Sequence, residues 1–169
     1  DIDYETARGV IVGERAATNP AQHLVQNTHA LLIKLKDDGP REITPDFVRR
    51  VHELLLENID ASSFTTKIPW GAEWPEDPMT QDQALSEICA LANDELVDAA
   101  EHPIITAQKL ICKCWKTAPF QSCNYTIGSL LSRLYLKQHG FPVFVYIPSS
   151  SLTLVWKSGT YTDESICPY

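Results

Sequence analysis

Two stretches with the apolar period of an α-helix, residues 104–115 and 127–136, meet through the loop segment 117–129. Apolar residues that recur every three to four positions predict helices. The earlier stretch is apolar on most of its sides, which is typical of a central buried helix. The sequence therefore predicts a helix–loop–helix junction inside a mainly α-helical domain, with backbone N–H groups presented at the loop.

Start and stop signals predict further helices along the chain. Asn-Pro at 19–20 and Thr-Pro at 44–45 each place a capping side chain before a proline at the first helical position. Thr80 can cap a helix that follows it, and Gly140 is typical of a helix C-terminus. We expect helices to begin next to each of these N-terminal signals and the last helix to end before Gly140.

Two regions have features of β-structure. Residues 61–78 carry three prolines, Gly71 and two tryptophans, which predicts a loop with at most a short hairpin at 64–70. Residues 141–147 and 151–156 have strand composition and are separated by a Pro-Ser-Ser-Ser turn. The expected fold class is therefore mainly α, with a short β-hairpin and a few short C-terminal strands.

Length and charge narrow the class of protein. The 169 residues suit one domain over 1–169, because a chain of this size can bury a sufficient hydrophobic core without disulfides or bound metal ions. The net charge of −8 argues against a nucleic-acid partner, which needs a basic surface. No run approaches 18 apolar residues and the first residues do not resemble a leader peptide, so we expect a soluble protein without a membrane partner. The oligomeric state is left open.

The cysteines indicate a reducing compartment. There are five, an odd number, and most lie within apolar helical patterns, which predicts a cytoplasmic protein with free thiols. Cys112 and Cys114 are two apart, so on a helix they point to different faces and make a poor metal site. We expect no metal site.

Several motifs follow one another at regular intervals. In the second half of the chain they are 102–107, Pro119-Phe120 with Asn124, Gly128 with Leu130-Leu131, and 140–142; residues 44–55 and 64–67 precede them. Together they resemble the core of a Fic (Fido) domain over roughly residues 25–148. The signature of that family is His-Pro-Phe-x-Asp/Glu-Gly-Asn-Gly-Arg-x-x-Arg at the start of a helix. The resemblance implies a Fic-like helical domain, whose family transfers a phosphate-linked group, usually AMP from ATP, to a hydroxyl of a target protein.

The resemblance places residues without suitable chemistry at the two central catalytic positions. The family histidine removes the proton of the target hydroxyl, and Ala118 stands at its position. The family carboxylate holds the Mg²⁺ that neutralises phosphate charge, and Ser122 replaces it with a much weaker ligand. Both reactive groups of the motif are therefore missing.

The phosphate-holding positions also differ from the family pattern. Cys123 and Tyr125 replace the two glycines that let backbone N–H groups wrap an anion. Thr126 and Ser129 replace the two arginines that grip the distal phosphates. Asn124 is retained and is the one candidate contact to a nucleotide. The residues that shape the turn are kept, whereas the residues that carry out chemistry are not.

These losses predict a catalytically inactive pseudoenzyme. A missing general base costs a factor of about 10² to 10⁴, and a missing electrostatic clamp costs a similar factor. We therefore expect no AMP transfer, no cofactor, and a role as a protein-binding or regulatory module. The alternatives are a divergent Fic-type nucleotidyltransferase or a nucleotide-binding protein that uses ATP and Mg²⁺. Two further alternatives are a plain helix–helix connection in an unrelated α-domain and a cysteine enzyme built on Cys123.

The partner-binding surface is expected at the segment that resembles the substrate-docking flap of Fic domains, residues 62–74. In that family a target segment adds to the hairpin edge as an extra strand, so main-chain hydrogen bonds supply the affinity. Tryptophans in a proline-rich loop are plausible interface anchors, although they can equally fold back as a small loop core. The candidate binding residues are Phe64, Thr65, Thr66, Lys67, Ile68, Trp70 and Trp74.

Overall fold

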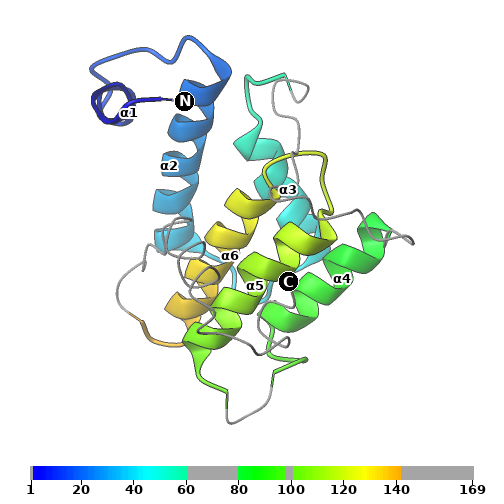
Figure 1. Ribbon diagram of the computed structural model, residues 1–169. Helices are drawn as coiled ribbons and strands as arrows, with labels where there is room; N and C mark the ends of the chain where they lie inside the picture. Colours follow the sequence, from blue (N-terminus) through cyan, green and yellow to red (C-terminus); the bar gives the residue numbers. More distant parts are fainter. Residues whose placement is uncertain (1, 61–79, 98–100, 142–169) are drawn as a thin grey trace, which may run out of the picture.

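The computed structural model describes residues 2–60, 80–97 and 101–141 (Figure 1). These ranges contain the helices α1 (Tyr4–Ile11), α2 (Pro20–Asp38), α3 (Pro45–Leu55), α4 (Gln81–Ala92), α5 (Pro103–Thr117) and α6 (Asn124–Gln138), and no strand. The mainly α-helical class is confirmed. The expected hairpin at 64–70 and the strand at 151–156 lie outside the described residues, as does all of the expected strand 141–147 except its first residue.

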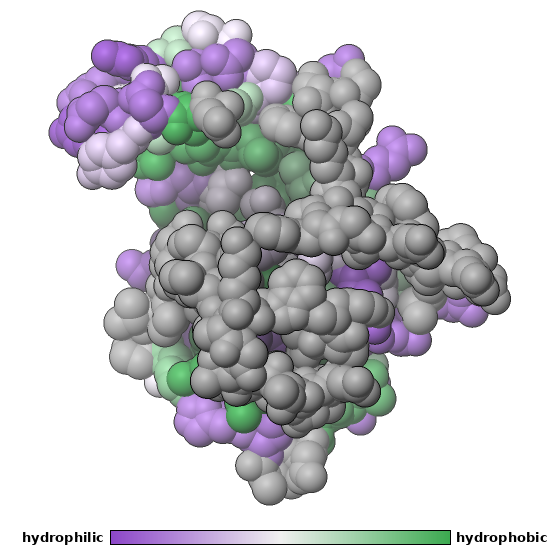
Figure 2. Space-filling model, viewed as in Figure 1, coloured by the Kyte–Doolittle hydropathy of each residue, from purple (hydrophilic) through white to green (hydrophobic). Residues whose placement is uncertain are grey.

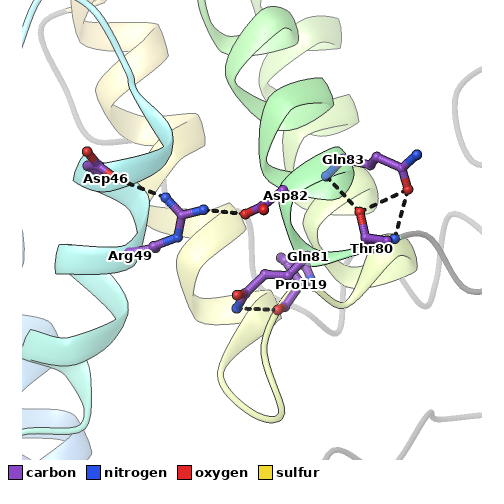
Figure 3. Close-up of polar contacts among 7 residues, drawn as sticks. All are labelled: Asp46, Arg49, Thr80, Gln81, Asp82, Gln83 and Pro119. Atoms are coloured by element: carbon purple, nitrogen blue, oxygen red, sulfur yellow. Dashed lines mark hydrogen bonds and ion pairs between the residues drawn. The ribbon is translucent and has the colours of Figure 1, made fainter.

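The helices begin where local side-chain chemistry predicts. The side chains of Asn19 and Thr44 accept hydrogen bonds from backbone N–H groups three residues later, at 3.0 and 3.2 Å, and a proline follows each cap. Thr80 forms a capping box with Gln83, in which each side chain bonds the backbone of the other residue (Figure 3). The ring of His102 caps α5 by accepting from the N–H of Ile104. Each cap satisfies N–H groups that have no partner within the helix.

The most enclosed helix is α6, which packs against α2, α3, α4 and α5 (Figure 1). The expectation that α5 is buried on most sides is wrong at its first turn, because Ile104 and Ile105 are 44% and 37% exposed. Only one face of α5 is buried, and it includes Ala107, Leu110 and Ile111. An apolar composition permits burial, but the number of neighbouring helices decides how many sides of a helix are covered.

The helices α5 and α6 approach each other closely at Gly128. A Cβ atom at this position would lie 2.9 Å from the Cα of Ile111 and 3.0 Å from the Cβ of Cys114. Backbone atoms of α5 cannot move aside as a flexible side chain would. Gly128 therefore sets the spacing of the two helices that flank the 118–123 loop.

Two asparagines join segments that lie far apart in the sequence. Asn27 on α2 donates to the carbonyls of Leu55 and Glu57 at the end of α3, at 3.0 and 2.8 Å. Asn93, after α4, both accepts from the N–H and donates to the carbonyl of Ile43, each at 2.9 Å. These bonds satisfy backbone groups outside the helices and fix the position of α3 between α2 and α4.

The first helix lies at one end of the molecule, where it packs on α2. Figure 2 shows mostly hydrophilic side chains over α1, with apolar atoms on the adjoining part of α2. Within the described ranges, no helix combines the length and the apolar character that crossing a membrane requires.

Candidate functional site

The loop between α5 and α6 is bounded by two residues with left-handed backbone conformation. Ala118 ends α5 with φ 40° and ψ 57°, and its N–H donates to the carbonyl of Cys114 at 3.2 Å. Cys123 precedes α6 with φ 62°. This conformation costs a non-glycine residue roughly 1 to 2 kcal/mol, so contacts elsewhere must hold the loop in place.

Asn124 supplies two of these contacts. Its side chain is 3% exposed and spans the loop to Phe120, accepting from the N–H at 3.0 Å and donating to the carbonyl at 2.7 Å. Both polar atoms of the amide are thus engaged by the backbone of the loop. Asn124 therefore organises the turn, and its amide is already bonded within the protein.

The loop is also tied to α4. Gln81, the first residue of α4, donates from Nε2 to the carbonyl of Pro119 at 2.9 Å (Figure 3). The adjacent residue, Asp82, accepts from Arg49 of α3 at 2.6 Å, and Arg49 also binds Asp46 at 2.8 Å. This chain of contacts connects α3, α4 and the loop at one place.

Sequence reasoning missed Gln81 and Arg49 as residues that position the loop. Gln81 lies 38 positions from Pro119 in the sequence, and Arg49 lies 33 positions from Asp82. No local sequence pattern indicates which helix end will face a loop that lies far away in the sequence. The capping box at Thr80 was the only available signal, since it shows where α4 begins and therefore that Gln81 lies in its first turn.

His52 of α3 packs directly against the loop. Its ring stacks on Phe120 with 4.0 Å between the ring centroids and 12° between the planes. Burial lowers the pKa of His52, and the nearby Glu53 carboxylate opposes this shift only in part. The ring is therefore held neutral at the base of the loop, a position that its place in the sequence did not indicate.

Two buried polar atoms near this contact lack hydrogen-bond partners. They are Nε2 of His52 and Oγ of Ser122, the only such side-chain atoms in the described residues. Ser122 is 2% exposed. An unpartnered buried polar atom lowers the free energy of unfolding by about 1 to 3 kcal/mol. The hydrogen bonding around Ser122 is therefore less complete than that of the turn that Asn124 closes.

The site has little reactive chemistry. Burial raises the pKa of the Cys123 thiol, which keeps it protonated and weakens it as a nucleophile. Because Nε2 of His52 has no hydrogen-bond partner, it does not activate that thiol. The arrangement therefore lacks the thiol–imidazole pair that a cysteine enzyme needs.

The remaining motif positions lie at the start of α6. Ser129 is half-buried and its carbonyl accepts from the hydroxyl of Ser132 at 3.0 Å, while Tyr125 and Thr126 are half-buried in the first turn. No side chain caps this helix. The segment 117–129 contains no charged residue, so an anion here would meet no charged side chain of this segment.

In the parts of the chain that the structure describes, no three His, Cys, Asp or Glu side chains come together as they would around a metal ion. The predicted binding residues Phe64, Thr65, Thr66, Lys67, Ile68, Trp70 and Trp74 lie outside the described ranges. The structure therefore brings together the loop positions 118–129 but does not describe the flap. Comparisons of the chain with models of known protein families and with curated proteins found no match.

Proposed function

We propose that this chain is a catalytically inactive Fic-like domain that acts as a protein-binding or regulatory module. The observation that carries the proposal is the combination of an organised loop with an absence of charge in it. Asn124 closes the turn and Cys123 has a glycine-like φ of 62°, yet the segment 117–129 has no charged side chain. In this proposal the loop keeps the backbone shape of a phosphate-binding loop but lacks the charged side chains that would stabilise phosphate charge.

The backbone conformation of the loop supports the resemblance. The position aligned with the first family glycine, Cys123, has the left-handed conformation that favours glycine. Gly128 is retained where α5 and α6 come so close that a Cβ would meet the Cα of Ile111 at 2.9 Å. Both features belong to the frame of the motif and neither contributes to a reaction.

The chemistry of the loop favours inactivity. Ala118 provides no base, and the hydroxyl of Ser122 is buried at 2% exposure, where a hydrated metal ion has no access to it. Stabilisation of the charge that develops during phosphoryl transfer needs cations or preorganised donors. A transferase would lack the base, the metal ligand and both phosphate clamps.

Binding then falls to the flap in this proposal. Addition of a partner strand to a hairpin edge uses main-chain hydrogen bonds and requires none of the missing groups. The implied partner is an extended segment of another protein, docked along residues 62–74. Trp70 and Trp74 would anchor its side chains.

A second candidate, a nucleotide-binding protein without transfer activity, is favoured by one feature. The α6 N-terminus has no side-chain cap, and an uncapped helix N-terminus attracts anions. Thermal unfolding with ATP or AMP and Mg²⁺ separates the two candidates. A ligand at a hundred times its Kd adds roughly 2.7 kcal/mol to the free energy of unfolding. Mg²⁺ alone and adenosine, which lacks phosphate, are the controls.

The inactive binding module predicts no change in the unfolding temperature with either nucleotide. A rise with ATP or AMP that adenosine does not reproduce supports the second candidate. Mass detection of AMP on any protein incubated with the chain and ATP contradicts the proposal of inactivity.

A further inference from the structure

Asn124 begins a sequence motif for a covalent modification. Asn124, Tyr125 and Thr126 read Asn-x-Thr, the acceptor motif for an N-linked glycan. The other asparagines of the chain, at positions 19, 27, 58 and 93, have neither serine nor threonine two positions later. Asn124 is therefore the one residue of this sequence at which a glycan of this kind can be attached.

The position of Asn124 in the fold is unusual for this motif. A glycan is large and hydrated, so its acceptor normally lies in a surface loop. Asn124 is 3% exposed, and Phe120 and Ser122 of the same loop are 8% and 2% exposed. A sugar on Asn124 would have to occupy space that the loop and the first turn of α6 fill. The folded chain therefore cannot hold a glycan at its acceptor residue.

The amide nitrogen that would carry the glycan is already bonded. Nδ2 of Asn124 donates to the carbonyl of Phe120 at 2.7 Å, and Oδ1 accepts from the N–H of the same residue at 3.0 Å. Attachment of a glycan forms a bond between Nδ2 and the first sugar carbon, breaks the bond from that carbon to the pyrophosphate of a lipid-linked donor, and releases one proton from Nδ2. Nδ2 then carries a bulky group in place of a hydrogen, and the amide no longer fits between the two backbone groups of Phe120.

We propose that Asn124 is a latent N-glycosylation site whose modification and the closed loop exclude each other. The side chain either closes the turn at Phe120 or carries a glycan. Because the folded loop buries the amide, a glycan can be attached only before the chain folds. A chain modified in this way loses both bonds that close the turn, while the left-handed backbone at Ala118 and Cys123 still has to be held.

This exclusion restricts where the chain can fold. N-linked glycans are attached on the lumenal side of the membranes of the secretory pathway, so a chain that stays on the cytoplasmic side keeps its amide and closes its loop. The cysteines indicate the same side. Cys89 and Cys114 are buried in the core with free thiols, a state that reducing compartments maintain. Entry into the secretory pathway would instead prevent the loop from closing.

The test is cell-free translation of the whole chain, behind a cleavable secretory leader, with membranes that attach N-linked glycans. A reductant keeps the five cysteines as thiols. We expect the imported chain to gain one mass increase that an endoglycosidase removes. After the membranes are dissolved in mild detergent, protease should digest this product at least about tenfold faster than the imported variant Thr126→Ala, because proteolysis follows the population of opened molecules.

Two substitutions at Thr126 separate the effect of the glycan from that of the sequence change. Thr126→Ser keeps the acceptor motif and should give a glycosylated, protease-sensitive chain like the wild type. Thr126→Ala removes the motif but leaves Asn124 in place, so the imported chain should stay unmodified and resist protease. A wild-type chain imported without a glycan, or a glycosylated chain as resistant as Thr126→Ala, overturns the proposal.

A third variant moves the glycan to an exposed position. Gln26 lies on the exposed side of α2 and is followed by Asn27 and Thr28, so Gln26→Asn creates a new Asn-x-Thr motif there. Combined with Thr126→Ala, it should yield an imported chain that is glycosylated and still resists protease. Equal sensitivity of this variant and the wild-type chain contradicts the proposal, because the glycan would then destabilise the chain wherever it is attached.

Discussion

The side-chain amide of Asn124 binds both backbone groups of Phe120, the N–H at 3.0 Å and the carbonyl at 2.7 Å. One side chain thus replaces the pairing that a helix or sheet would give this stretch of backbone. The contact spans four residues and is buried, so the loop keeps its shape without a charged or metal-bound centre.

Replacement of Asn124 by alanine is expected to lower the free energy of unfolding by about 2 to 3 kcal/mol, because it leaves a buried donor and a buried acceptor of Phe120 without partners. Urea unfolding measures the change. The matched control is Gln26→Ala on the exposed side of α2, where the expected change is within about 0.5 kcal/mol. Equal effects of the two substitutions would show that Asn124 does not hold the loop.

Gly128→Ala should destabilise the α5–α6 packing by about 1 to 3 kcal/mol, because the new methyl group would lie 2.9 Å from the Cα of Ile111. Thermal unfolding provides the measurement. The control is Gly9→Ala in α1, where the nearest atoms belong to the flexible side chain of Arg15. That change should be neutral or stabilising, since alanine favours helix more than glycine does. A tolerated Gly128→Ala would mean that the helices can separate at little cost.

Cys123→Gly is expected to raise the free energy of unfolding by about 1 kcal/mol, because glycine adopts the observed φ of 62° without steric strain. The control, Ala30→Gly on the exposed surface of α2, should cost about 1 kcal/mol, as usual for glycine inside a helix. Chemical denaturation of both variants measures the two changes in the free energy of unfolding, which should have opposite signs. Destabilisation by both would indicate that the Cys123 side chain contributes packing that outweighs the strain.

The neutral state of His52 makes stability depend on pH. Burial lowers the pKa of His52, so the unfolded chain binds a proton at this residue before the folded chain does. The free energy of unfolding should therefore fall as pH decreases from the ordinary histidine range, near 6.5, toward the lower folded pKa. His52→Phe keeps a ring that can stack on Phe120 and removes the unpartnered Nε2.

We expect the difference in stability between His52→Phe and the wild-type chain to grow in favour of the variant as pH falls from about 7 to about 5. Urea unfolding at several pH values measures this difference, and subtraction removes the contribution of other titrating groups. Gln26→Ala removes no titratable group, so it is the control and should give a difference that changes little with pH. A pH-independent difference for His52→Phe would contradict the assignment of a neutral buried ring.

Partner binding should depend on the flap more than on the loop. Trp70→Ala removes a proposed anchor, and Thr66→Pro removes a main-chain donor from the proposed strand edge. Each is expected to weaken binding of an extended partner peptide by at least about tenfold, which corresponds to about 1.4 kcal/mol. Titration of a purified partner segment supplies the measurement, and Tyr125→Ala is the comparison in the loop. Loss of affinity with Tyr125→Ala alone would place the interaction at the start of α6.

Local chemistry made the helix boundaries predictable. The caps at Asn19, Thr44 and Thr80 bond backbone groups three residues away. All residues that form such a cap therefore lie within one helical turn, and a short stretch of sequence is enough to predict it. The loop between α5 and α6 was less predictable. Its lack of charge is visible in the sequence, but the expected loop 117–129 is too long, because α6 already begins at Asn124, three residues before the apolar period that predicted this helix. The sequence analysis expected Asn124 and Gly128 to shape the turn, but it did not describe their contacts.

The sequence by itself determined that this protein is mainly helical, where α2, α3 and α4 begin, and that the segment 117–129 contains no charged group. Only the tertiary structure decided that α6 is the enclosed helix, that His52 stacks on Phe120, and that Asp94 faces His139. The physical reason is the range of the interactions. Caps and periodicity act within a few residues, whereas contacts between distant segments depend on how each helix is rotated and packed, which no local pattern encodes.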